Sequence, residues 1–254
     1  MSLAAYIAQL PFFDTHSHSA GSDLGTARED RGGKSLPQVL FNDYLLYLVG
    51  ACGELPKGSP GGVADAAEQF RAMLPVLRQF SAMGTYAALR EGIRELHPFA
   101  EDDLCLENFA AVNASIVRAY QTHGERGWHR QILARAGIVM QNQMVVLSYL
   151  SEHWAGLPAA ARAAQQEVLA PSLILDGYLF TGFVSGAPGR RYSMDLLGQH
   201  PQTHAAYLNF LSAVLDRFQT LGGWSVKLLT AYHRSLSFQR VSDERAVALF
   251  ARGP

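Results

Sequence analysis

The sequence has few charged residues and no excess of either sign. Only 17% of its 254 residues are Asp, Glu, Lys or Arg, against about 25% in an average soluble protein. The 21 basic and 22 acidic residues leave a formal charge of −1. Because no basic excess is available to neutralise phosphates, we expect no nucleic-acid partner. Hydrophobic residues make up 48%, and a chain with so little charge and so much apolar surface is not disordered.

Cysteines, long apolar runs and targeting signals are also scarce. The two cysteines, Cys52 and Cys105, are spaced for neither a zinc knuckle nor a disulfide scaffold. No apolar run approaches the ~18 residues of a membrane-spanning helix. The opening residues MSLAAYIAQLPFF contain no lysine or arginine and lack the cleavage site of a secretory leader. The sequence therefore predicts a globular cytoplasmic protein without a membrane partner.

Several common catalytic motifs are absent. The sequence contains no GxGxxG, Walker A or GxSxG pattern, so neither a nucleotide-binding loop nor a nucleophile elbow is expected. His200 and His204 are four residues apart, but the segment between them lacks the glutamate of the HExxH zinc motif. We therefore expect no metal site at this pair.

Hydrophobic periodicity divides the rest of the chain into a helical part and an α/β part. After a short helix that ends at Pro11, residues 11–19 predict a first strand. From residue 36 to residue 136 apolar positions recur at helical spacing, which predicts a large helical insertion. Residues 137–254 alternate helical stretches with short runs rich in Val, Ile, Tyr and Phe. This alternation is typical of βα units that form a parallel sheet.

The four expected strands fit half of a (β/α)8 barrel. A complete barrel needs about 250 residues, and an insertion of roughly 100 residues leaves room for four or five βα units of ~30 residues. We therefore predict an α/β fold in one domain over residues 1–254. This domain is the N-terminal half of a distorted (β/α)8 TIM barrel with a large helical insertion after the first strand. An open four-stranded parallel sheet is the alternative.

Asp14, His16 and His18 occupy alternate positions at the end of the predicted first strand. In a regular strand this spacing puts the three side chains on one face. Two imidazoles at a strand end can chelate one divalent ion, and imidazole suits zinc, iron or nickel. On spacing alone, the alternative is a pair of hydrogen-bonded polar residues that leave the core.

The segment FFDTHSH resembles the DxHxH motif that opens the first barrel strand of the amidohydrolase superfamily. The helical block that follows is similar to that of the uronate isomerase-like, amidohydrolase-related branch, in particular FNDYLLYLVGACG and TYAALREGIREL. WSVKLLTAYHRSLSF resembles the middle-strand segment of the same proteins. The resemblance runs from Pro11 to the end of the chain. It implies a metal-dependent enzyme in which His16 and His18 bind the metal and Asp14 supports them.

The resemblance also shows what the chain lacks. Members of this superfamily complete the metal site with further histidines and a general-base aspartate on strands five to eight. These positions would lie beyond Pro254, so we expect a fragment or one part of a split enzyme. Alone, the chain should bind metal poorly and show no turnover. Its open strand edges should lead to self-association or to binding of a complementary C-terminal half.

Lys227 is the next candidate, in a run where it alternates with Ser225 and Leu229. A buried lysine needs a partner or a modification. It is a carboxylated residue that bridges two metals, an ammonium that faces substrate, or one member of a structural ion pair. Tyr232 and Arg234 follow at the end of this strand, where barrel enzymes place active-site loops. Arg234 either holds a substrate carboxylate in a bidentate contact or is solvated.

Two further groups of basic residues could bind an anion. Arg190 and Arg191 lie in the glycine-rich segment GAPGRRYSMD, which we expect to be a loop that clamps an anionic group or is simply solvated. In the insertion, Arg90, Arg94 and His97 recur near helical spacing. They face the substrate if their helix covers the barrel mouth, and otherwise form a surface stripe.

These features together predict a metal-dependent hydrolase of the amidohydrolase type. It would act on a small, carboxylate-bearing substrate through a metal-activated water, with zinc as the ion and manganese or iron as alternatives. An aldose–ketose isomerase of the uronate isomerase type is the alternative enzyme. A non-catalytic helical interaction module is the alternative from another class.

Overall fold

The computed structural model describes residues 2–7, 9–17, 34–40, 65–179, 186–232 and 235–252. The chain divides into two compact units. The sheet unit combines Met1–Thr26 with Gly137–Pro254, and the helical unit is Ala27–Ala136. Within the described residues, no helix is long and apolar enough to cross a membrane.

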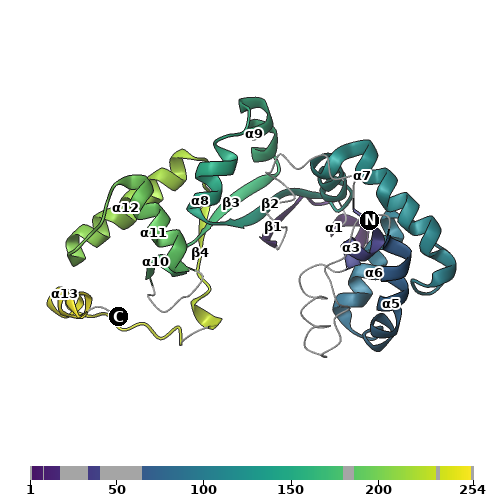
Figure 1. The fold of residues 1–254 in the computed structure, drawn as a ribbon, viewed down its shortest axis with the longest axis horizontal. Coiled ribbons are helices and arrows are strands. Elements are labelled where there is room, and N and C mark those ends of the chain that lie inside the picture. Colours follow the sequence, from purple (N-terminus) through teal and green to yellow (C-terminus); the bar gives the residue numbers. More distant parts are fainter. Residues whose placement is uncertain are drawn as a thin grey trace. The chain divides into compact units, whose positions relative to one another are not determined.

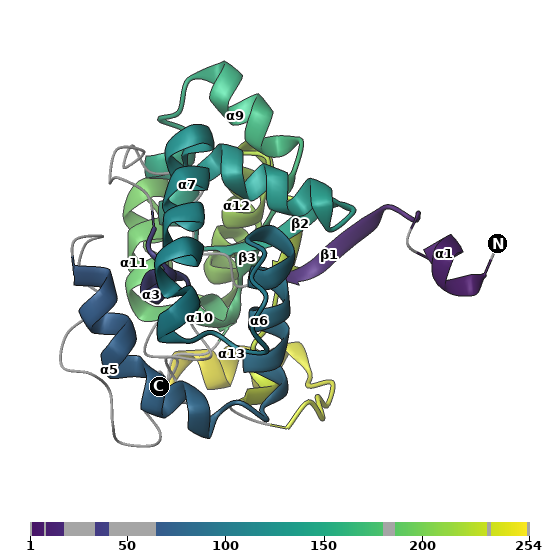
Figure 2. The same ribbon diagram turned by 90° about the vertical axis from the view of Figure 1, so that its right-hand side faces the viewer.

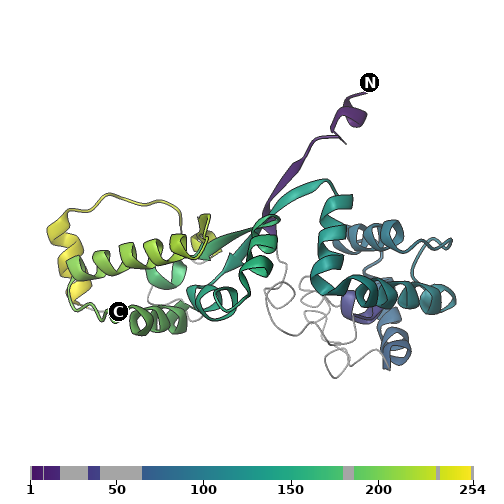
Figure 3. The same cartoon turned by 90° about the horizontal axis from the view of Figure 1, so that it is seen from above.

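Among the described residues, the sheet unit contains four strands and a series of helices (Figure 1). In chain order these are α1 (Leu3–Ile7), β1 (Phe12–Ser17), β2 (Ile138–Val145), α8 (Leu147–Tyr149), the π-helix η2 (Leu150–Trp154), α9 (Ala159–Gln166), β3 (Leu169–Ile174), α10 (Asp176–Leu179), α11 (Gly186–Leu197), α12 (His204–Thr220), β4 (Ser225–Lys227), the 3-10 helix η3 (Thr230–Tyr232) and α13 (Asp243–Ala251). Helix α1 lies away from the other elements of this unit (Figure 3), and Leu3, Tyr6 and Ile7 on it are exposed.

The four strands form one sheet in the order β1-β2-β3-β4. All three pairs of neighbouring strands are parallel, and helices lie on the connections from β2 to β3 and from β3 to β4. This is the succession of βα units that the alternating sequence pattern predicts. Because the strands are parallel, their carboxyl ends meet along one edge of the sheet.

Pro171 lies in the middle of β3, where a residue without an N–H is unusual. Its carbonyl oxygen accepts a 2.9 Å hydrogen bond from the Trp224 amide, on the β4 side. In a parallel strand the N–H and C=O of one residue point towards the same neighbour. The side of Pro171 that lacks an N–H therefore faces the segment just before β4, which begins at Ser225. No regular hydrogen bond between β3 and β4 is lost at this position.

Helix α12 covers the sheet with an apolar stripe. Phe210, Val214 and Phe218 recur every fourth residue on this helix and are all buried, as a one-sided helical pattern requires. They belong to a core cluster that also contains Val145, Leu147, Leu150, Leu169, Leu173 and Tyr178. This cluster fixes β2 and β3 and thereby the position of their carboxyl ends.

The helical unit is built from α3 (Leu36–Leu40), α5 (Ala66–Gln79), α6 (Gly84–Leu96) and α7 (Leu106–Arg135) (Figure 2). Its core cluster shares no residue with that of the sheet unit and includes Leu36, Leu40, Phe70, Tyr86, Ile93, Val112 and Ile116. Helix α7 is interrupted at Gly124, whose φ of 66° and ψ of 168° are not helical. Glycine adopts this conformation without the steric penalty that a side chain would bring.

Helix α11 differs from the loop expected for GAPGRRYSMD. Its backbone is helical from Gly186 to Leu197. Pro188 is tolerated because it lies in the first turn, where the amide groups have no partner within the helix. The apolar residues that follow, Met194 and Leu197, pack against the core cluster of the sheet unit. This packing outweighs the glycines, which alone suggested a loop.

Candidate functional site at the carboxyl ends of the strands

Of the two predicted metal ligands, only the backbone of His16 is described. His16 is a residue of β1, but its side chain and the whole of His18 lie outside the described residues. Within the described residues, no group of three or more His, Cys, Asp or Glu side chains could hold a metal ion. The assignment of His16 and His18 as metal ligands therefore stays a prediction.

The register of β1 shows an irregularity close to these residues. Asp14 pairs with Gln141 of β2, and Ser17 pairs with Gln143. A step of three residues in β1 thus matches a step of two in β2, as in a β-bulge. The regular alternation expected along this strand is therefore interrupted between Asp14 and Ser17. The sequence pattern did not reveal it, because a bulge adds one residue without changing composition.

Asp14 is tied to the neighbouring strand. The Gln141 side-chain amide donates a 3.0 Å hydrogen bond to the Asp14 carboxylate. Gln141 is buried, and so is Gln143 two residues later, whose two amide atoms have no hydrogen-bond partner in the described part of the chain. Buried amides without partners are rare. The buried glutamines Gln141 and Gln143 of β2 are therefore polar residues of this edge that the sequence pattern did not predict.

Asp176 joins the carboxyl ends of β3 and β4. It is completely buried at the residue where α10 begins. One carboxylate oxygen accepts a 2.7 Å hydrogen bond from the Leu229 amide, and the other accepts a 3.2 Å hydrogen bond from the Thr230 hydroxyl. The sequence signal was available, because Asp176 directly follows the apolar run of β3.

Lys227 and Tyr232 lie on either side of the segment that Asp176 holds. Lys227 is the last residue of β4, half-buried, and pairs with Ile174. Tyr232 ends η3 with 76% of its surface exposed, so its hydroxyl is accessible to a ligand. Arg234 lies outside the described residues. The structure thus places Lys227 at the edge where the four strands end, and its predicted chemistry stays untested.

Arg190 and Arg191 belong to a helix and not to a loop. Arg191 is exposed on α11, whereas Arg190 is hydrogen-bonded to Tyr207 of α12. Burial raises the pKa of the Tyr207 hydroxyl, and Arg190 offsets part of that rise. Tyr207 in turn donates a hydrogen bond to the Tyr178 carbonyl. Arg190 therefore has a structural partner, and of the two arginines Arg191 is the more accessible.

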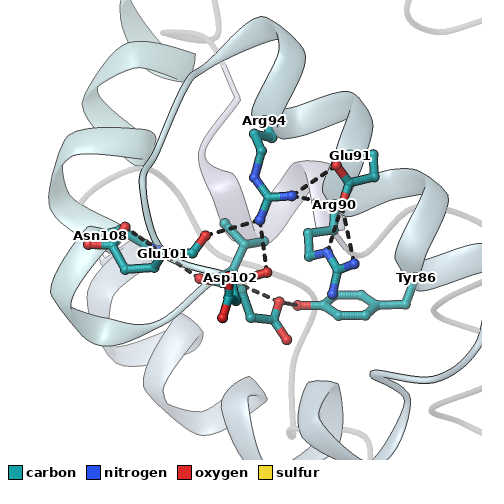
Figure 4. A network of polar contacts seen from close by, with 9 residues as sticks. Tyr86, Arg90, Glu91, Arg94, Glu101, Asp102 and Asn108 are labelled. Atoms are coloured by element: carbon teal, nitrogen blue, oxygen red, sulfur yellow. Dashed lines mark hydrogen bonds and ion pairs between the residues drawn. The ribbon is translucent and has the colours of Figure 1, made fainter.

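Arg90 and Arg94 of the insertion form polar contacts within the helical unit. Arg94 contacts the Glu91 carboxylate at 2.8 Å and donates hydrogen bonds to the carbonyls of Glu101 and Asp102. Arg90 also contacts Glu91, at 3.1 Å (Figure 4). The Arg94 guanidinium holds the pKa of the Glu91 carboxyl below its usual value. Arg90 and Arg94 thus belong to a partly exposed polar network on α6, and their contact with a substrate stays a prediction.

His97 does not belong to that stripe. It is buried, its Nδ1 lies 2.9 Å from the Ser115 hydroxyl, and its ring packs against Trp128 with centroids 5.6 Å apart. Burial, followed by the nearby charge of Arg135, lowers the pKa of His97 to about 4. The imidazole is therefore neutral at pH 7. The surface-stripe prediction is wrong for His97, because this residue follows the last turn of α6 and its ring is buried against Ser115 and Trp128 of α7.

His200 and His204 have separate partners. His200 precedes α12 and lies 3.7 Å from the Asp195 carboxylate. His204 is the first residue of α12, and its ring contacts Phe250 edge-on.

Comparisons with known proteins rest on the fold alone. No protein-family model matches the chain, and no curated protein sequence matches it significantly. Solved crystal structures do resemble it, among them two isomerases. They are a uronate isomerase from Thermotoga maritima, with a TM-score of 0.70, and a glucuronate isomerase from Caulobacter crescentus, with a TM-score of 0.69. Each is 16% identical in sequence to this chain.

The coverage of these matches is unequal. They include 96% of this chain but only 51% and 50% of the two isomerases, so the chain spans about half the length of the solved structures. The fold is half of a (β/α)8 barrel. The predicted fold class is thereby confirmed, including the large helical segment after the first strand.

Proposed function

We propose that this half-barrel carries the metal-binding part of an aldose–ketose isomerase that acts on a carboxylate-bearing sugar, as a uronate isomerase does. The observation that supports this proposal is the fold similarity to two such isomerases over 96% of the chain. The sequence adds His16, a residue of β1, and His18 two positions later, near the edge at which barrel enzymes build their sites.

The donor chemistry fits a divalent ion in part. His16 and His18 would supply two imidazoles, and zinc normally takes three or four protein ligands. Asp14, held by Gln141, would orient the strand end that carries the two histidines. When bound, the ion would polarise the hydroxyl and carbonyl groups of a sugar. We propose zinc, with manganese or iron as the other ions to test.

The substrate carboxylate would bind the basic residues at the same edge. Lys227 stands at the end of β4, and Asp176 fixes the backbone of Leu229 and Thr230 between Lys227 and Tyr232. These two hydrogen bonds, which we call the Asp176 clamp, hold the backbone between Lys227 and Tyr232 in place. The groups that donate them, an amide and a hydroxyl, are both uncharged. Arg234, and Arg191 on α11, are the further candidates for the carboxylate.

Hydrolysis through a metal-activated water is the second candidate, because the same two histidines would serve it. Both solved structures bear the names of isomerases, which favours isomerisation. A non-catalytic interaction module stays an untested prediction.

Metal binding tests the ligand assignment. The purified chain, its double variant His16→Ala/His18→Ala and the control His200→Ala/His204→Ala are titrated with Zn²⁺ and Mn²⁺ by calorimetry. We expect weak binding by the wild type, since only two ligands are present, and loss of binding in the first variant alone. Equal binding by all three proteins would contradict the proposal.

Activity separates the two enzyme classes. The chain is mixed with a separately expressed C-terminal half of the Thermotoga maritima uronate isomerase, and conversion of glucuronate to a ketose is followed by NMR. The chain alone should show no turnover. Isomerisation by the mixture that disappears in His16→Ala/His18→Ala would support the proposal, whereas metal-dependent hydrolysis of an amide or ester without isomerisation would replace it.

A further inference from the structure

Both outer strands of the sheet present apolar side chains to solvent. Within the described residues, β1 and β4 each have a single neighbouring strand. Phe12 and Phe13 of β1 are 42% and 44% exposed, and Val226 of β4 is 50% exposed. Trp224 and Leu228, which flank β4 at alternate positions, are exposed as well. Parallel strands that are this apolar are normally covered on both faces.

The helix after β4 does not cover this surface. None of the residues of α13 is buried, and Val247 and Leu249 on it are exposed. By contrast, the paired residue of Val226 on β3, Leu173, is completely buried. Apolar packing therefore stops abruptly between β3 and β4. Exposed apolar side chains that gather along one sheet edge mark an interaction surface.

We propose that this surface binds a second copy of the chain. In the dimer, β4 of each copy lies parallel to β1 of the other, and the two half-barrels close one eight-stranded barrel. The inference goes beyond the proposed reaction and requires neither metal nor substrate.

Strand direction supports a second copy as the occupant. All four strands are parallel, so a copy related by a two-fold axis along the barrel presents a correctly directed β1 to β4 and a correctly directed β4 to β1. Such an interface is isologous and closes on itself. Two copies also supply eight strands, the number in a closed barrel, and restore the half that the solved isomerases have in addition.

Charge and area are compatible with this dimer. A net charge of −1 gives little repulsion between copies. A stable interface buries about 800 Å² per partner, and aromatic side chains supply 150–250 Å² each when fully buried, as a typical magnitude. Three half-exposed aromatic residues and two aliphatic ones, spread over the two edges of each copy, supply part of this area.

The experiment measures mass by light scattering over a range of protein concentrations. The wild type should give twice the chain mass of 27.7 kDa. Val226→Lys and Phe13→Glu should each weaken the dimer by about tenfold or more, because each buries a charge at the interface. Leu208→Lys is the matched control: Leu208 lies on α12 and is also 50% exposed, and this variant should stay dimeric. Circular dichroism verifies that all variants fold.

Mixing the two edge variants identifies the pairing. A heterodimer of Val226→Lys and Phe13→Glu has one unaltered β4–β1 edge and places opposite charges at the other, so mixing should restore the dimer. A wild type that is monomeric at every concentration would overturn the proposal and leave the edges to a complementary half-barrel of different sequence. Dissociation by Val226→Lys alone, without rescue on mixing, would indicate β4–β4 pairing and also overturn it.

Discussion

His97 makes the stability of the helical unit depend on pH. Its imidazole has a pKa of about 4 in the folded chain and about 6.5 when unfolded. The folded state therefore disfavours the protonated form of the His97 imidazole. Stability is complete above pH 6.5 and falls as the pH decreases towards 4, because the unfolded state then binds more protons. A difference of this size corresponds to roughly 3 kcal/mol.

A neutral substitute should remove this dependence. We expect the free energy of unfolding of His97→Asn to fall less than that of the wild type between pH 7 and pH 4.5, in urea titrations at each pH. His200→Asn is the control, since His200 is exposed, and it should follow the wild type. Parallel pH profiles for all three proteins would show that His97 is not the responsible group.

Single residues were the hardest feature to predict from sequence. The burial of His97 depends on Ser115 and Trp128, which lie 18 and 31 positions further along the chain. The Asp176 clamp depends on an amide 53 positions away. No local pattern encodes such contacts. Candidate site residues such as Lys227 could be predicted only from their residue type and their position at the end of a strand.

Elements were predicted better, because their signals are local. The four strands, their parallel direction and the helical segment after the first strand follow from hydrophobic periods. Two local features misled the prediction. Glycines in the first turn of α11 suggested a loop, and the irregular register between Asp14 and Ser17 does not alter the alternating pattern of the sequence.

The turn from α12 to β4 gives a prediction at this scale. Gly222 has a φ of 91°, and a β-carbon at Gly223 would overlap the buried ring of Phe218. We expect Gly223→Ala to lower the free energy of unfolding by about 1–3 kcal/mol, as overpacked cores do. Gly92 lies inside α6 with open space around it, and Gly92→Ala should instead gain about 0.5–1 kcal/mol.

Denaturant titrations of the two variants and the wild type measure these changes. Because both variants add the same methyl group, the difference between them reports the contact between residue 223 and the Phe218 ring. If Gly223→Ala were as stable as the wild type, the turn would have to differ from the structure described above.

At the scale of the whole molecule, the chain has two hydrophobic cores. The cluster around Phe70 lies entirely in the helical unit, and the cluster around Phe210 lies entirely in the sheet unit. The helical unit is inserted between β1 and β2. The sheet unit must therefore bring together two chain segments that lie far apart in sequence, whereas the helical unit is continuous and relies on local contacts.

Separate cores predict separate unfolding transitions. Phe70 and Phe210 are both completely buried, and replacing either by alanine typically costs about 3–5 kcal/mol. In calorimetry of the wild type we expect two transitions, since independent cores do not obey two-state behaviour. Phe70→Ala should lower the temperature of one transition and Phe210→Ala that of the other. A single transition lowered equally by both substitutions would mean that the two cores unfold as one cooperative body.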